Sequence, residues 1–270
     1  MRELEARISA AAELLARARE ELGHGEFRAS DRSHGSSGAL RRAKSRLGRL
    51  QANEAAVPVE PLRFIPCPLS VAGPADQLSP AALELADVRV PGRLGIDRLQ
   101  VRTGERVLVT GSNGAGKSTL LDVMAGVLKP VSGTCAANQV VAYLRQHPTG
   151  FPAHWLAAQA FCHGSGRGLE EDLGQLLSLG LFRRGELVAR VGALSLGQRR
   201  RIDVARVFAR PADVLLLDEP TNHLSPALAD DLERALDAFA GTVVLVSHDR
   251  ALRSRFSGRR IHLENGRIVQ

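Results

Sequence analysis

A glycine-rich segment, GSNGAGKST at residues 111–119, directly follows a short apolar run, RVLVT. Glycine backbones adopt conformations that side chains block, so their N–H groups can surround phosphate oxygens. Between a predicted strand and a predicted helix, the G-x-x-x-x-G-K-[ST] pattern is typical of a nucleotide-phosphate site. We expect Lys117 to reach the β- and γ-phosphates and Ser118 to bind Mg²⁺. The expected phosphate-binding residues are Gly111, Ser112, Asn113, Gly114, Ala115, Gly116, Lys117, Ser118 and Thr119.

Two adjacent acids end a second apolar run, VLLLDEP at residues 214–220. In open α/β folds, ligands bind at the carboxyl edge of the sheet, where such a strand ends. We expect Asp218 to hold Mg²⁺ and Glu219 to orient or polarise the attacking water. The alternative, two acids that cap a surface loop, fits less well because Pro220 ends the strand directly after them.

Three further segments contain polar residues that complete a pattern: YLRQHP with Gln146, LSLGQ at 194–198, and SHD at 247–249. Taken alone, Ser195 is best interpreted as the N-cap of the helix that follows it. Together with the phosphate loop and the acidic strand, however, the ordered set resembles an ABC-type ATPase. The resemblance covers residues 83–270.

The resemblance implies roles for these residues, with ATP and Mg²⁺ as cofactors. Gln146 would contact Mg²⁺ and the water, and His248 would contact the γ-phosphate, so that both act with Glu219 in catalysis. In this family the signature of one ATPase domain faces the phosphate loop of another, and ATP lies between the two domains. The signature residues that would act on a partner's ATP are Ser195, Leu196, Gly197 and Gln198.

Other segments resemble one branch, the ABC-F family, whose members lack transmembrane domains and act on ribosomes. The run DEPTNHLSP at 218–226 is similar to that family, as is LSLGQRRR, and EPLRF at 60–64 is similar to its antibiotic-resistance members from actinobacteria. The sequence departs from the family pattern at Ser225, where an aspartate is usual. Residues 88–101 also lack an aromatic residue to stack on adenine, which leaves the choice between ATP and GTP open.

Strand and helix patterns alternate from residue 83 onward, which predicts an α/β fold with a mostly parallel sheet covered on both faces. With the resemblance, the expected fold is a P-loop NTPase of the ABC ATPase type with a small helical subdomain. The expected strands lie within 83–90, 106–110, 139–146, 212–220 and 242–249, and the expected helices within 116–128, 170–179, 195–208 and 225–239.

The N-terminal part has a different pattern. Apolar residues recur at spacings of three and four within 1–22 and 39–54, which predicts an antiparallel helical hairpin over 1–56. Two helices that lie on the globular core are the alternative. Prolines within 57–82 favour an extended linker. We therefore predict the hairpin, this proline-rich linker and an ABC-type ATP-binding domain over 83–270.

The chain is basic, with a net charge of +7 and a pI near 10.3. A genome of high GC content would explain the many arginines, but clustering at 28–49 favours a polyanionic partner. The candidate RNA contacts there are Arg28, Arg32, Arg41, Arg42, Lys44 and Arg46. The sequence shows no apolar run long enough to cross a bilayer and no signal peptide, so we expect a cytoplasmic protein without a membrane segment of its own. The three cysteines lack metal-ligand spacing.

The resemblance implies that the chain is the C-terminal half of an ABC-F protein: the interdomain linker plus the second ATP-binding domain. Such a factor binds the ribosomal E site near rRNA and tRNA and protects the ribosome from antibiotics. ATP, sandwiched with a partner ATPase domain, drives binding, and hydrolysis drives release. The partner would be the missing N-terminal half or a second copy of the chain. Two alternatives remain: an exporter ATPase subunit that docks on separate membrane domains, and an inert truncated half.

Overall fold

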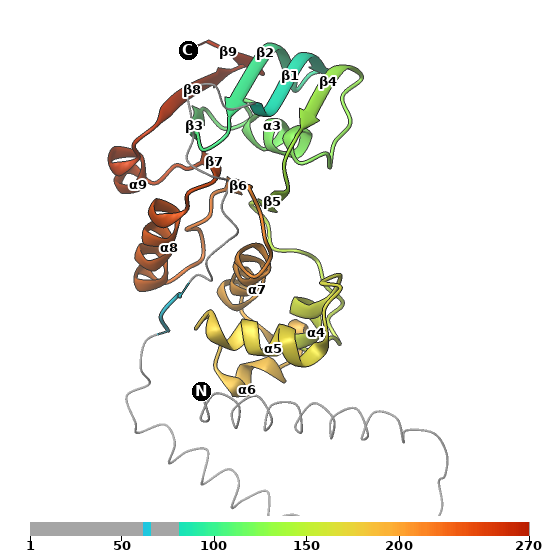
Figure 1. The fold of residues 1–270 in the computed structure, drawn as a ribbon, viewed down its shortest axis with the longest axis vertical. Coiled ribbons are helices and arrows are strands. Elements are labelled where there is room, and N and C mark those ends of the chain that lie inside the picture. The colour runs from blue at the N-terminus through green and yellow to red at the C-terminus, as the bar shows by residue number, and fades with distance from the viewer. Residues whose placement is uncertain (1–61, 66–80, 270) are drawn as a thin grey trace, which may run out of the picture. The chain divides into compact units, whose positions relative to one another are not determined.

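The structure, a computed structural model, describes residues 62–65 and 81–269 (Figure 1). The predicted hairpin over 1–56 and all six candidate RNA contacts lie outside these residues, as does most of the predicted linker. Within the described segments, no helix is both long enough and apolar enough to cross a membrane.

A six-stranded sheet forms the centre of the fold, in the order β5–β6–β7–β3–β8–β9. All neighbouring strands are parallel except β8 and β9, which pair antiparallel. Every residue of β6 and β7 is buried, as expected for strands covered on both faces. The prediction of a mostly parallel sheet is confirmed. The strands are β3 (Arg106–Gly111), β5 (Val141–Leu144), β6 (Val214–Asp218), β7 (Thr242–Val246), β8 (Arg259–Glu264) and β9 (Arg267–Ile268).

A second, three-stranded sheet has the order β2–β1–β4 and is antiparallel throughout. It contains β1 (Ala81–Val90), β2 (Leu94–Arg102) and β4 (Ser132–Ala137). The sequence predicted a strand at 83–90 but not its place in a separate sheet. The short turn at 91–93 joins β1 directly to β2 and permits only an antiparallel pair, so β1 pairs with β2 and not with the parallel strands of the large sheet.

Helix α3 (Lys117–Met124) joins the two sheets into one hydrophobic core (Figure 1). Its fully buried Leu120 and Leu121 pack in a cluster with Leu83 and Leu85 of the small sheet and with strand residues of the large one. The helix begins at Lys117, directly after the last glycine of the glycine-rich segment. The core therefore fixes the end of the phosphate loop.

A helical region is inserted between β5 and β6. It contains α4 (Ala157–Cys162), α5 (Leu169–Ser178), α6 (Arg184–Leu187), the short 3₁₀ helix η1 (Val191–Ala193) and α7 (Leu196–Phe208). Ser195 caps α7: its hydroxyl accepts a hydrogen bond from the Gln198 N–H at 3.2 Å, and the Gln198 side chain accepts one from the Ser195 N–H at 2.9 Å. These helices between β5 and β6 confirm the predicted small helical subdomain.

Two more helices follow strands β6 and β7. Helix α8 (Pro226–Ala238) starts with the Ser225–Pro226 pair that the sequence predicted as a helix start. Helix α9 (Arg250–Arg255) is capped by Asp249, whose carboxylate accepts hydrogen bonds from the N–H groups of Ala251 and Leu252 at 2.8 and 3.3 Å.

The short segment 62–65 is anchored on this domain through Phe64. The Phe64 ring is 6% exposed and meets Phe208, the last residue of α7, edge-on at 5.0 Å between ring centroids. Its N–H donates to the buried Asp231 of α8 at 2.9 Å, and the N–H of Ile65 donates to the Leu179 carbonyl at 3.0 Å. One residue therefore contacts both the helical region and the helix that follows the acidic strand.

This anchor predicts a stability effect. Phe64→Ala removes a buried ring and should lower the free energy of unfolding by about 3 kcal/mol. Urea unfolding followed by circular dichroism measures the change. Ile65→Ala is the matched control, because that neighbouring side chain is 61% exposed and should have little effect. Equal destabilisation in the two variants would contradict the prediction.

Candidate active site

The phosphate loop curves from the end of β3 into the first turn of α3. Lys117 lies back across the loop, and its Nζ donates to the carbonyls of Gly111 and Ser112 at 2.9 and 2.8 Å. Gly116 has a φ of 100°, and a side chain there would meet the Arg93 carbonyl at 2.6 Å. Glycine is required at 116 because only glycine permits both this backbone conformation and this close approach.

One cavity of about 1100 Å³ gathers most of the predicted nucleotide-site residues. Gly111, Ser112 and Ala115 do not line it, and they form the back of the loop instead: the first two hold Lys117, and the Ala115 carbonyl accepts from the Gly266 N–H. The predicted residues that do line it are Asn113, Gly114, Gly116, Lys117, Ser118, Thr119, Gln146, Asp218, Glu219 and His248.

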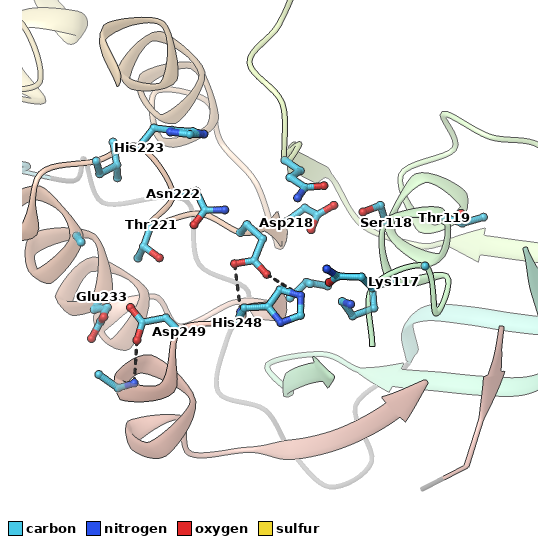
Figure 2. A pocket seen from close by; sticks show the side chains of 18 of the residues that line it. Lys117, Ser118, Thr119, Asp218, Thr221, Asn222, His223, Glu233, His248 and Asp249 are labelled. Atoms are coloured by element: carbon cyan, nitrogen blue, oxygen red, sulfur yellow. Dashed lines mark hydrogen bonds and ion pairs between the residues drawn. The ribbon is translucent and has the colours of Figure 1, made fainter. Parts of the chain in front are cut away.

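The two acids lie at the carboxyl end of β6, as the sequence predicted, and both are almost fully buried, with 2% exposed for Asp218 and 3% for Glu219. Figure 2 shows Asp218 facing Ser118. The Glu219 carboxylate accepts a hydrogen bond from the His248 N–H at 3.1 Å, and its other oxygen lies 3.7 Å from His248 Nε2. The exposed His248 imidazole therefore lies beside a buried carboxylate at the cavity wall.

Burial dominates the electrostatics of this site. It raises the pKa of the Asp218 carboxyl, which the Ser118 hydrogen bond and the Lys117 charge partly oppose. It also raises the pKa of Glu219, although the backbone N–H of His248 favours the charged form. Burial lowers the pKa of Lys117, against the attraction of the two acids. Each charge in the site is thus disfavoured by desolvation and supported by an opposite neighbour.

The site fits a hard divalent cation such as Mg²⁺. One buried carboxylate oxygen of Asp218, Oδ2, has no hydrogen-bond partner among the described residues. The Ser118 hydroxyl interacts with the same carboxyl group. No group of three or more histidine, cysteine or acidic residues that could hold a metal is found in the described part of the chain. A site with one carboxylate and one hydroxyl suits Mg²⁺, which keeps waters and takes further oxygens from substrate phosphates.

The signature residues Ser195–Gln198 do not line the cavity, although they lie at the N-terminus of α7 as predicted. Gly197 is in close contact with the segment after the acids, because a side chain there would meet the His223 carbonyl at 2.7 Å. Leu196 is 48% exposed. This chain's signature is therefore separate from its own phosphate loop.

Sequence reasoning missed several residues that line the cavity. Gly92 and Arg93 reach it because the β1–β2 turn folds over the phosphate loop, where the Gly266 carbonyl accepts from the Gly95 N–H at 2.8 Å. An aromatic residue would have indicated a nucleotide contact in this turn, but the sequence has none there, so it did not predict that Arg93 lines the cavity. Glu233 of α8 and Arg255 of α9 line another part of the cavity wall. They form an ion pair, with 2.6 Å between Arg255 Nη2 and Glu233 Oε2.

The buried acids predict a pH-dependent stability difference. An unfolded glutamate ionises near its ordinary pKa of 4.5, whereas Glu219 ionises at higher pH in the folded protein. The folded state therefore binds more protons between these two values, and stability falls as pH rises through that window. Glu219→Gln removes this cost, so at about pH 7 it should raise the melting temperature by about 2–4 °C, equivalent to roughly 1 kcal/mol.

Differential scanning calorimetry without nucleotide measures this difference. At about pH 4, below the window, the advantage of Glu219→Gln over the natural chain should vanish. Glu170→Gln, an acid-to-amide change at an exposed position of α5, is the control and should not change the melting temperature. An advantage that is the same at both pH values would show that ionisation is not its cause.

Comparison with known proteins agrees with this geometry. The ABC transporter family matches residues 95–222. The tylosin resistance ATP-binding protein TlrC of Streptomyces fradiae is 47% identical over 245 residues, which are 91% of this chain and 44% of that protein. ATP-binding cassette sub-family F member 3 of Pongo abelii is 38% identical over 187 residues, 64% of this chain and 26% of that protein. The chain thus spans less than half the length of these relatives.

Solved structures share the fold. A dimeric ATP-binding cassette bound to ADP and Pi, in a post-hydrolysis state, superposes with a TM-score of 0.59 at 20% identity, over 70% of this chain and 97% of that one. The motifs, the mixed α/β fold and the similarity to these relatives agree, so the chain carries an ABC-type ATPase domain and belongs to the ABC-F family.

Proposed function

We propose that this chain binds and hydrolyses ATP as part of an ABC-F factor that binds the ribosome at its E site and protects it from antibiotics. The observation that carries the proposal is the buried Glu219 carboxylate beside His248, on the same cavity as Lys117. The tylosin resistance named for TlrC supports the antibiotic part. As a ribosome-binding factor, the protein would act in the cytoplasm.

The proposed chemistry is hydrolysis of the γ-phosphate. The water oxygen bonds to the γ-phosphorus, the bond to the β–γ bridging oxygen breaks, and ADP leaves. Glu219 orients the water and accepts its proton, while His248 contacts the γ-phosphate from the cavity wall. The ammonium of Lys117 and the loop N–H groups stabilise negative charge on the β- and γ-oxygens. When bound by Ser118, Asp218 and Gln146, Mg²⁺ neutralises further phosphate charge.

The proposed site is completed by a second ATPase domain. The signature residues of this chain lie away from its own cavity, which supports action on the ATP of a partner domain. The helix N-terminus and the N–H groups at Ser195–Gly197 would face that nucleotide. The partner is the N-terminal half of a longer protein or a second copy of this chain.

Nucleotide binding tests this function directly. The chain should bind a fluorescent ATP analogue with Mg²⁺, and Lys117→Ala should weaken binding by about tenfold or more. Turnover of the isolated chain should be negligible at low concentration, since each composite site needs two domains. Glu219→Gln should retain ATP and favour an ATP-dependent dimer in size-exclusion chromatography, while the control Glu170→Gln behaves like the natural chain.

Two outcomes would contradict this assignment. Hydrolysis that is robust and independent of protein concentration would refute the need for a partner. A natural chain that binds no nucleotide would favour the inert truncated half.

Ribosome binding tests the rest of the proposal. In the full-length protein, changing Arg28, Arg32, Arg41 and Arg42 to glutamine should weaken co-sedimentation with ribosomes. The dependence on salt should also become shallower, by about 0.7–0.9 in the logarithmic slope for each phosphate that is no longer neutralised. The matched control changes four arginines that are exposed on the ATPase domain, namely Arg98, Arg102, Arg250 and Arg260.

The two sets of substitutions remove the same charge, so equally weakened binding would show that net charge, rather than the basic cluster at 28–49, directs binding. Co-purification of the full-length protein with a membrane protein instead of ribosomes would favour the exporter-subunit alternative.

A further inference from the structure

Arg200 is the largest fully buried side chain of the described residues, with 0% of its surface exposed. It lies in α7, in the turn after the capped signature Ser195–Gln198. A buried guanidinium costs free energy unless its N–H groups find acceptors. In most proteins a carboxylate supplies them. Here the acceptors are backbone carbonyls of two segments that line the active site.

The two ends of the guanidinium bind different segments. Nη2 donates to the carbonyls of Asp218 and Glu219, at 3.1 and 2.8 Å. Nη1 donates to the carbonyl of Arg145 and, at 3.4 Å, to that of Gln146. The planar fork of arginine suits this arrangement, because its donors project in two fixed directions.

The contact with Glu219 supports an unusual backbone. Glu219 has a φ of 49°, a left-handed conformation that costs a residue with a side chain free energy. Its N–H donates to the Val246 carbonyl at 2.9 Å, and its carbonyl accepts from Arg200. Both sides of the residue are thereby fixed, and this conformation sets the direction of the carboxylate toward His248.

The contact with Gln146 fixes the loop that follows β5. Gln146 lies outside any regular element and lines the cavity. Helix α7 holds this loop at a second point, where the buried Asp203 accepts from the Thr149 N–H at 2.9 Å. The same helix therefore positions Gln146 and Glu219 and presents the signature at its N-terminus.

We propose that Arg200 is a positioning residue for ATP hydrolysis. It holds the backbone of Glu219 and of Gln146 in a fixed position relative to the signature helix. The inference rests on the proposed function. Because α7 is a single helix, a displacement of its N-terminus by a partner's nucleotide moves Arg200 and, with it, the two carbonyl pairs. Nucleotide bound at the signature thereby adjusts the acid and the glutamine of this chain's own site.

Arg200→Lys tests the proposal, since lysine keeps the charge but lacks the fork. Arg167→Lys is the matched control: Arg167 lies in the helical region just before α5, and its guanidinium donates to the carbonyl of Ala209, at the C-terminal end of α7, at 2.7 Å. Arg167 is not among the residues that line the nucleotide cavity or the hollow beside it. The measurements are steady-state hydrolysis of ATP by the full-length protein, binding of a fluorescent ATP analogue, the melting temperature, and hydrogen exchange.

We expect Arg200→Lys to lower kcat by about 10- to 100-fold with KM and analogue affinity within about threefold of the natural protein. Amide exchange should accelerate in peptides that cover 145–150 and 219–224, while β6 stays protected. Arg167→Lys should leave kcat and both peptides unchanged, even if it lowers the melting temperature equally. Preserved kcat in Arg200→Lys, or an equal decrease of kcat in both variants, would overturn the proposal.

Failure of the proposed function gives a different result. If the natural protein binds no ATP, the assignment of an ATPase is wrong. The exchange comparison without nucleotide still decides whether Arg200 holds the two loops, because it requires no turnover. Loops that exchange equally in the natural protein and in Arg200→Lys would then refute the positioning role by itself.

Discussion

Burial of two adjacent carboxylates at the end of β6 is the constraint on which the rest of this site depends. Desolvation disfavours both charges, so the surrounding groups must support them. That support comes from three separate parts of the fold: Lys117 and Ser118 at the start of α3, the His248 backbone after β7, and Arg200 in α7. The sequence motifs lie far apart in the chain, and the fold brings one neighbour of the acid pair from each of them.

The fold brings these neighbours together by making the large sheet parallel. In a parallel sheet the carboxyl ends of β3, β6 and β7 meet at one edge, so the loop, the acids and the histidine follow from three neighbouring strands. The hydrophobic core beneath them, from α3 and both sheets, then holds the edge rigid. A polar site of this kind needs such a support because its own charges do not stabilise the fold.

Helix α7 carries the signature and also contacts the nucleotide cavity, which the signature residues do not line. Its N-terminus carries the signature away from the cavity, while Arg200 and Asp203 hold the loops of the cavity itself. Its last residue, Phe208, packs on Phe64 of the segment 62–65, which belongs to the same compact unit. One helix thus contains the signature at its start, contacts the acids through Arg200 and packs on the segment 62–65 through Phe208. These three parts of the domain are therefore held by a single element.

The strand–helix order, the phosphate loop, the acids and the capped start of α7 could all be predicted from the sequence, since they depend on local pattern and short spacing. Other features depend on the folded chain. Residues 83–90 joined a separate antiparallel sheet because of a turn, and Arg93 reached the cavity through that same turn. Arg200 stands in a run of three arginines, and this local pattern does not indicate that its side chain is fully buried. Its four carbonyl acceptors come from distant segments, and only the folded backbone brings them within hydrogen-bond distance.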